Sequence, residues 1–297
     1  MDTVWTTVGS SVWMLAGGRR RSRLEATPAC RDGVVERLDI VQVMVKDGAD
    51  VLDALAAQHH ELATILDSTD EQAWQRPSRC SGWSVADVVL HLAQTDEMAV
   101  ASVEGRFREF LQGPSGGSQT STVDEGAALL VDQQRGLAVA DLRARWGTAA
   151  EQLVGSLRAA DPHQRVQWVV GELSVRTLAT TRLAEAWIHT GDVADGLGLV
   201  QNNDGRLVHV ARLAWRTLPY AFEREGHELH GPVEFDLTGP SGEQWRFTPD
   251  GAPVTVVRGD GVELCMVAAR RMAASATGLI ASGRDEDAVL SVVRTYA

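Results

Sequence analysis

The chain has 297 residues, of which 44% are hydrophobic and 23% are charged, a composition typical of soluble globular proteins with room for two domains. Its formal net charge of −12 and its isoelectric point near 5.1 argue against a nucleic-acid-binding surface. The three cysteines lack C-x-x-C spacing, so neither a disulfide framework nor a thiolate zinc site is indicated. No apolar run approaches the roughly 18 residues of a membrane-spanning helix. We therefore expect a cytoplasmic protein that binds neither nucleic acid nor membrane.

Residues 1–43 differ from the sequence that follows them. A short apolar run at residues 12–16 precedes the basic run at residues 19–23, which reverses the order of a secretory signal. Regular helical periodicity begins only near Asp50. We expect residues 1–43 to be a disordered extension that the folded domains do not need.

Apolar periodicity predicts four principal helices in a domain at residues 44–200. The first spans residues 50–66, the second begins at Ser84, the third covers about 138–160, and the fourth ends at Gly196. Helices of this number and length are typical of a four-helix bundle, in which inward side chains of facing helices build metal sites.

The second helix has a strong start signal and carries a histidine on its buried face. Ser84 is predicted to cap the helix and Asp87 to return the hydrogen bond, as in a capping box. His91 falls within the apolar face that follows. A single histidine in such a face is more often a hydrogen-bonded core residue than a metal ligand, so His91 alone does not indicate a site.

The fourth helix contains Glu185 and His189, which are four residues apart and therefore leave the helix on the same face. A carboxylate and an imidazole at this spacing can bind one metal ion, and a third ligand from elsewhere would complete an open catalytic site. The face that carries Glu185 also contains Leu178 and Ile188 and would otherwise be core. Burying an acid there is costly unless a cation or strong donors meet it.

After Gly226 the hydrophobic pattern changes to a period of two residues, which predicts a small α+β domain at residues 201–297. The elements expected in this domain are a helix at 205–226, strands at 233–238, 245–247 and 254–257, and helices at 262–275 and 286–295.

These features occur in the order of a known family. Gly82-Trp83-Ser84 and His91 come first, Glu185-x-x-x-His189-x-x-Asp192 follows, and an α+β domain ends the chain. Residues 45–297 thereby resemble the mycothiol-dependent maleylpyruvate isomerase family. The resemblance implies a two-domain α+β fold, with a DinB-like four-helix bundle followed by a sterol-carrier-like domain.

The resemblance also implies a site. It implies that His91, Glu185 and His189 hold a divalent metal, usually Zn²⁺, and that Arg270 is the arginine that the C-terminal domain supplies to the cleft. We expect Arg270 to contact an anionic group of the substrate or the carboxylate of the thiol. The chain departs from the family at Gly191, where a bulky aromatic residue is usual, and at Ala269, where a glycine is usual. The resemblance therefore supports the metal ligands of the family more strongly than it supports the family's substrate.

Of the three functions that the chemistry of the donors leaves open, we expect a thiol-dependent metalloenzyme that acts as an isomerase or S-transferase. Two imidazoles and one carboxylate would leave Zn²⁺ cationic, with a position at which a thiol loses its proton near neutral pH. A mycothiol-like thiol could then isomerise a small electrophilic substrate or be transferred to it, whereas water in that position would give hydrolysis. The third alternative is a non-enzymatic module that binds a small ligand.

Two further expectations complete the site and the assembly. Asp192, one turn after His189, is expected to orient that imidazole, with a surface acid as the alternative. We expect a monomer or a small homo-oligomer.

Overall fold

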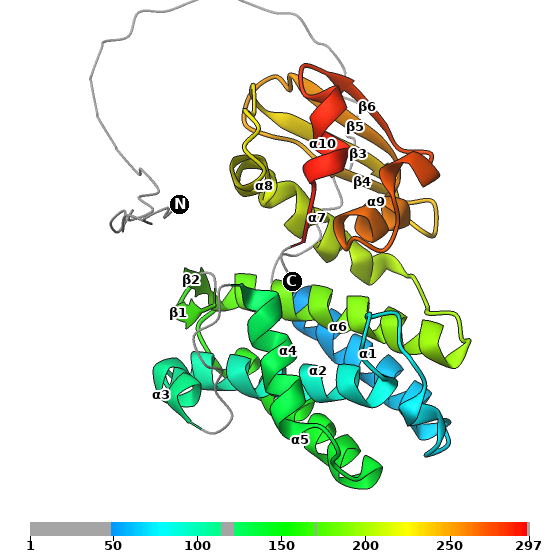
Figure 1. Cartoon of the computed structure of the whole chain (residues 1–297). Helices are drawn as coiled ribbons and strands as arrows, with labels where there is room; N and C mark the ends of the chain where they lie inside the picture. The colour runs from blue at the N-terminus through cyan, green and yellow to red at the C-terminus, as the bar shows by residue number, and fades with distance from the viewer. Residues whose placement is uncertain (1–48, 114–121, 170, 296–297) are drawn as a thin grey trace, which may run out of the picture. The chain divides into compact units, whose positions relative to one another are not determined.

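A computed structural model describes residues 49–113, 122–169 and 171–295 of the chain (Figure 1). Helices make up most of the first part and a four-stranded sheet with helices makes up the last, so the predicted α+β fold class is confirmed. The expected extension at residues 1–43 lies outside the described residues. None of the described helices is both long enough and apolar enough to cross a membrane.

Four long helices form the predicted bundle. They are α1 (Ala49–Asp67), α2 (Val85–Val103), α5 (Val139–Ala159) and α6 (Val175–Leu197). Helix α2 packs against α5 and α6, and α1 packs against the same two helices. Shorter elements that the apolar periodicity did not reveal connect them: η1 (Ala73–Gln75), α3 (Phe107–Gln112), α4 (Val123–Gln134) and the hairpin of β1 (Arg165–Trp168) with β2 (Gly171–Ser174).

The start of α2 is fixed by the capping box that the sequence predicts. The Ser84 hydroxyl accepts a hydrogen bond from the Asp87 amide at 3.2 Å, and the Asp87 carboxylate accepts from the Ser84 amide at 2.9 Å. Because the cap sets where the helix begins, it also sets which positions face the bundle interior. His91 therefore lies on the inner face of α2, with 6% of its surface exposed.

Helix α6 is buried on almost all sides, which is the expected state of a helix without a clear polar face. Leu178 and Leu183 belong to the core that α6 shares with α1, α2 and α5. Ala184, Trp187 and Ile188 belong instead to the core of the C-terminal part. One helix thus contributes to both cores, and the candidate ligands Glu185 and His189 lie on it.

The C-terminal part begins with η2 (Gly205–Leu207), α7 (Val208–Arg216) and α8 (Leu218–Arg224). Its sheet has the order β4-β3-β5-β6, in which β3 pairs with β5 in parallel and the other pairs are antiparallel. The strands are β3 (Val233–Thr238), β4 (Gln244–Phe247), β5 (Thr255–Asp260) and β6 (Ile280–Gly283). The other elements are α9 (Gly261–Ala268), η3 (Ala274–Ala276) and α10 (Glu286–Val292).

The helix expected over 286–295 ends at Val292, and two other predicted helices differ more from the structure. The helix expected over 205–226 is divided at Thr217, and Pro219 follows in the first turn of α8, where its missing N–H costs nothing. The helix expected over 262–275 ends at Ala268, and Arg270 takes a left-handed backbone conformation with φ of 59°. This second difference changes which arginine reaches the candidate site.

Candidate functional site

The structure brings together the three predicted metal ligands. His91 comes from α2, and Glu185 and His189 come from adjacent turns of α6. Glu185 Oε1 lies 2.8 Å from His91 Nε2 and 3.4 Å from His189 Nε2, and the donor atoms of all three residues lie within 4.8 Å of one another. Their exposed fractions are only 6–8%. Two imidazole nitrogens and one carboxylate oxygen that converge in this way fit a single divalent ion.

The protonation states within this cluster are strongly coupled. Burial by itself would raise the pKa of Glu185, but hydrogen bonds from His189 and His91 hold that pKa well below its ordinary value. Burial likewise would lower the pKa of His189, but hydrogen bonds to Asp192, Cys80 and Glu185 raise it well above the usual range. Burial lowers the pKa of His91. Without metal, these shifts favour an ionised Glu185 and a protonated His189, and they disfavour protonation of His91.

Asp192 orients His189 from the side away from Glu185. The carboxylate of Asp192 is fully buried and accepts a hydrogen bond from His189 Nδ1 at 2.9 Å. This bond fixes the ring so that Nε2 faces Glu185 and His91, which is the usual arrangement of a metal-binding histidine. Burial opposes ionisation of Asp192, but hydrogen bonds from Arg271 and His189 hold its pKa far below the ordinary value.

The arginine that contacts this cluster is Arg271. Its Nε and Nη2 atoms donate to the two oxygens of Asp192 at 2.6 and 2.5 Å. Arg270, the residue that the resemblance indicates, is exposed and donates from Nη1 to the carbonyl of Ser291 at 2.9 Å. The structure therefore does not bring Arg270 to the cluster. The physical reason is that the helix expected over 262–275 ends at Ala268. Neither arginine therefore points in the direction that a continued helix would give it.

Cys80 is a site residue that the sequence did not reveal. Its Sγ atom lies 3.1 Å from Asp192 Oδ2, 3.8 Å from His189 Nδ1 and 3.8 Å from Arg271 Nη2. Cys80, His189 and Asp192 could in principle hold a cation. The guanidinium of Arg271 already occupies Asp192, so this second group is the poorer cation site. Cys80 stands in a loop before α2, where no periodicity marks it.

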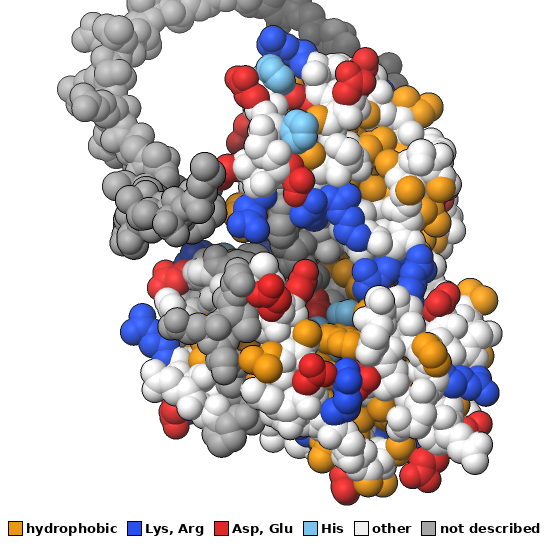
Figure 2. Space-filling view, viewed as in Figure 1, with side chains coloured by type: hydrophobic (Ala, Val, Ile, Leu, Met, Phe, Trp, Pro, Cys, Tyr) orange, Lys and Arg blue, Asp and Glu red, His pale blue; other side chains and the backbone are white. Residues whose placement is uncertain are grey.

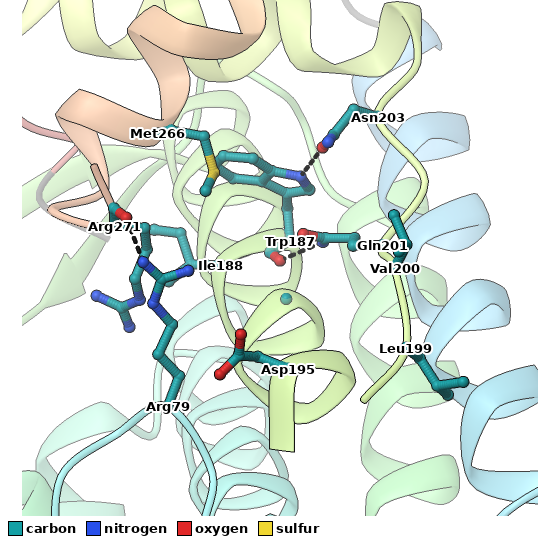
Figure 3. A pocket seen from close by; sticks show the side chains of 11 residues that line it. Arg79, Trp187, Ile188, Asp195, Leu199, Val200, Gln201, Asn203, Met266 and Arg271 are labelled. Atoms are coloured by element: carbon teal, nitrogen blue, oxygen red, sulfur yellow. Dashed lines mark hydrogen bonds between the residues drawn. The ribbon is translucent and has the colours of Figure 1, made fainter. Parts of the chain in front are cut away.

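A pocket of about 230 Å³ opens beside the cluster, and Arg79, Trp187, Met266 and Arg271 are among the residues that line it (Figure 3). None of the three candidate metal ligands lines it. Figure 2 shows acidic and basic side chains mixed over the face in view, with basic side chains gathered near its middle.

Comparison with known proteins places the chain in a family. Residues 55–194 match the model of the mycothiol maleylpyruvate isomerase N-terminal domain. The chain is also 30% identical over 259 residues to uncharacterised proteins from two strains of Mycobacterium tuberculosis, and the match covers 86% of this chain and 97% of theirs. This chain belongs to the mycothiol maleylpyruvate isomerase family.

Crystal structures of the mycothiol-dependent maleylpyruvate isomerase, and of a histidine mutant of that isomerase, have the same fold as this chain. Each is 18% identical to the chain with a TM-score of 0.53, and the match covers 79% of this chain and 93% of the other. The predicted family resemblance and the two-domain α+β architecture are confirmed. The segment matched by the family model contains His91, Glu185 and His189 but ends before Arg271.

Proposed function

We propose that this protein is a metal-dependent enzyme that uses mycothiol or a similar small thiol to act on a small electrophilic substrate, by isomerisation or S-transfer. The observation that carries this proposal is the convergence of His91 Nε2, His189 Nε2 and the Glu185 carboxylate in one buried cluster. A divalent ion there, most simply Zn²⁺, would supply a Lewis-acidic position at which a thiol loses its proton near neutral pH.

The surrounding residues would maintain this position. Glu185 supplies the negative charge, and Asp192 holds the ring of His189 in the tautomer whose Nε2 faces the other donors. Arg271 keeps Asp192 ionised and presents its guanidinium both to the cluster and to the pocket. It replaces Arg270 as our candidate for contacting an anionic group of the substrate.

Thiol chemistry is favoured over hydrolysis by the state of the nearby acids. A metal-activated water is helped by a general base that takes its proton. Asp192 and Asp96 are each paired with an arginine, Arg271 and Arg182 respectively, and Glu97 is bound by Arg145 at 2.7 Å. A thiol has an ordinary pKa of about 8.5 and needs no such base once coordinated.

Two measurements test the proposal. The purified protein should contain about one divalent ion per chain by elemental analysis, and the variant with alanine at His91, Glu185 and His189 should contain none. With Co²⁺ in the site, adding mycothiol should produce a thiolate-to-cobalt absorption band and release a proton. Stoichiometric metal in the triple variant would contradict the ligand assignment. Turnover of an ester without any thiol would favour the hydrolase.

A further inference from the structure

The pocket beside the candidate metal cluster has opposite charges at its mouth. Arg79 donates from Nη2 to the carbonyl of Arg271, and within the described ranges it has no carboxylate within 4.0 Å. Asp195 lines the same pocket and likewise has no cation within that distance among the described residues. Both side chains are exposed. Figure 3 shows the guanidinium of Arg79 at the level of Ile188 and the carboxylate of Asp195 below Ile188 and Trp187.

Five of the residues that line the pocket are apolar. Trp187 and Ile188 of α6, Met266 of α9, and Leu199 and Val200 after α6 line it. Leu199 and Val200 have exposed fractions of 47% and 96%, which is unusual for large aliphatic side chains. Apolar surface next to two separated opposite charges fits a molecule with the same three features.

Gln201 lines this pocket and lies against Gly191. Its Nε2 donates to the Trp187 carbonyl at 2.6 Å, and its amide lies directly over Gly191. A Cβ atom at residue 191 would stand 2.5 Å from Gln201 Oε1, so only glycine permits this position of the side chain. Asn203 accepts from the Trp187 indole at 3.1 Å and holds the same segment against α6.

We infer that this pocket binds a small apolar amino acid, with its carboxylate on Arg79, its ammonium group on Asp195 and its side chain against Trp187 and Met266. Pairing each charged end of the ligand with a charged side chain gives charge-assisted hydrogen bonds, which are the stronger class. The volume of about 230 Å³ suits an amino acid of the size of leucine. No candidate metal ligand lines this pocket, but Arg271 does, so the inference rests beside the proposed function and an amino acid bound here would lie next to the residue that we assign to the substrate.

Titration calorimetry of the full chain with three probes of matched apolar tail tests the inference. L-leucine carries both charges, 4-methylpentanoate lacks the ammonium group, and isoamylamine lacks the carboxylate. L-leucine should bind at least about tenfold more tightly than either analogue, because each analogue leaves one charged side chain unpaired. Binding should persist in excess EDTA, which separates this site from the proposed metal chemistry. Equal affinities for the three probes, or loss of L-leucine binding in EDTA, would overturn the inference.

Variants then assign the two charges. Arg79→Gln and Asp195→Asn should each weaken L-leucine binding about tenfold or more, and Asp195→Asn should leave 4-methylpentanoate binding unchanged. Arg76→Gln removes an exposed arginine three residues away that does not line the pocket, and it should leave binding as in the wild type. Gln201→Ala should shift the preference several-fold from leucine toward phenylalanine. Wild-type binding in both Arg79→Gln and Asp195→Asn would refute the assignment.

Discussion

At the scale of single residues, the candidate site depends on how one carboxylate and two imidazoles share protons. Glu185 is the only anionic member of the predicted ligand set, and its carboxylate contacts both histidines. Its negative charge is therefore the feature of the ligand set that should contribute most to the affinity for a divalent cation.

Glu185→Gln keeps the shape of the cluster and removes that charge. We expect the affinity for Zn²⁺ to fall by more than ~100-fold, since the change acts on a ligand and outer partners alone give 10–100-fold effects. Chelator competition measures the affinity, and the thermal midpoint of the metal-free variant checks that the fold is retained. Unchanged affinity would remove Glu185 from the ligand set.

The raised pKa of His189 predicts a pH-dependent metal affinity. Below that pKa a metal must displace a proton, so affinity should rise about tenfold per pH unit and then level off above it. The metal-free protein should lose stability as the pH rises through the pKa of His189 in the folded state. The reason is that the hydrogen bonds of His189 in the folded protein favour its protonated form. Chelator competition between roughly pH 6 and pH 9 measures the first effect.

Asp192→Asn is the matched variant for this experiment. Asp192 is the foremost of the hydrogen-bond partners that raise the pKa of His189, so the level region should begin at a lower pH in the variant. The affinity in the level region should fall about 10–100-fold through loss of the orienting bond. An unshifted pH profile would show that Asp192 does not control the proton on His189.

At the scale of secondary-structure elements, a second polar layer joins the bundle helices one turn from the candidate ligands. Arg182 of α6 and Asp96 of α2 form an ion pair at 3.1 Å with side-chain exposures of 3% and 1%. His59 of α1 lies 3.7 Å from the same carboxylate. A buried pair of this kind adds little stability but is costly to break.

Arg182→Met should therefore lower the free energy of unfolding by about 3–5 kcal/mol, because Asp96 is left buried without a counter-charge. Adding Asp96→Asn should restore part of this loss. Arg158→Met, which breaks an exposed pair with Asp53, should cost less than about 1 kcal/mol. Urea denaturation of the metal-free protein measures all three variants. An Arg182→Met cost as small as that of the surface control would show that the pair is not desolvated.

The end of α9 also allows a prediction that separates the two arginines. Arg270 has a left-handed backbone conformation that glycine adopts without strain, so Arg270→Gly should stabilise the protein slightly, by up to about 1 kcal/mol. It should leave turnover unchanged. Arg271→Lys should reduce turnover, because lysine cannot replace the two-pronged contact with Asp192. Equal turnover effects at both positions would contradict the reassignment.

The positions of the site residues show which of them hydrophobic periodicity in the sequence can predict. His91, Glu185 and His189 are all in long capped helices, where spacing determines the face of each side chain. Cys80 and Arg271 lie in loops, where a position depends on contacts formed between distant segments. Strand β6 has four residues, of which Ile280 and Ser282 are exposed and Gly283 has no side chain, so no alternation of apolar and polar residues marked it.

At the scale of the whole molecule, α6 contributes residues to the cores of both the bundle and the C-terminal part. Because its residues belong to both hydrophobic cores, neither part can lose its structure without exposing apolar surface of the other. We expect one cooperative transition in denaturant, with the same midpoint by circular dichroism and by tryptophan fluorescence. Two separated transitions would indicate that the bundle and the C-terminal part unfold independently.

The contact between Asp192 and Arg271 has a consequence for how the protein matures on the ribosome. The two residues are 79 positions apart, so the bundle leaves the exit tunnel before the arginine that completes its histidine–aspartate pair has been made. A nascent bundle would therefore hold Asp192 without its guanidinium partner. We expect the proposed metal site to be complete only near the end of synthesis, and a chain truncated before Arg271 should bind Zn²⁺ more weakly than the full chain.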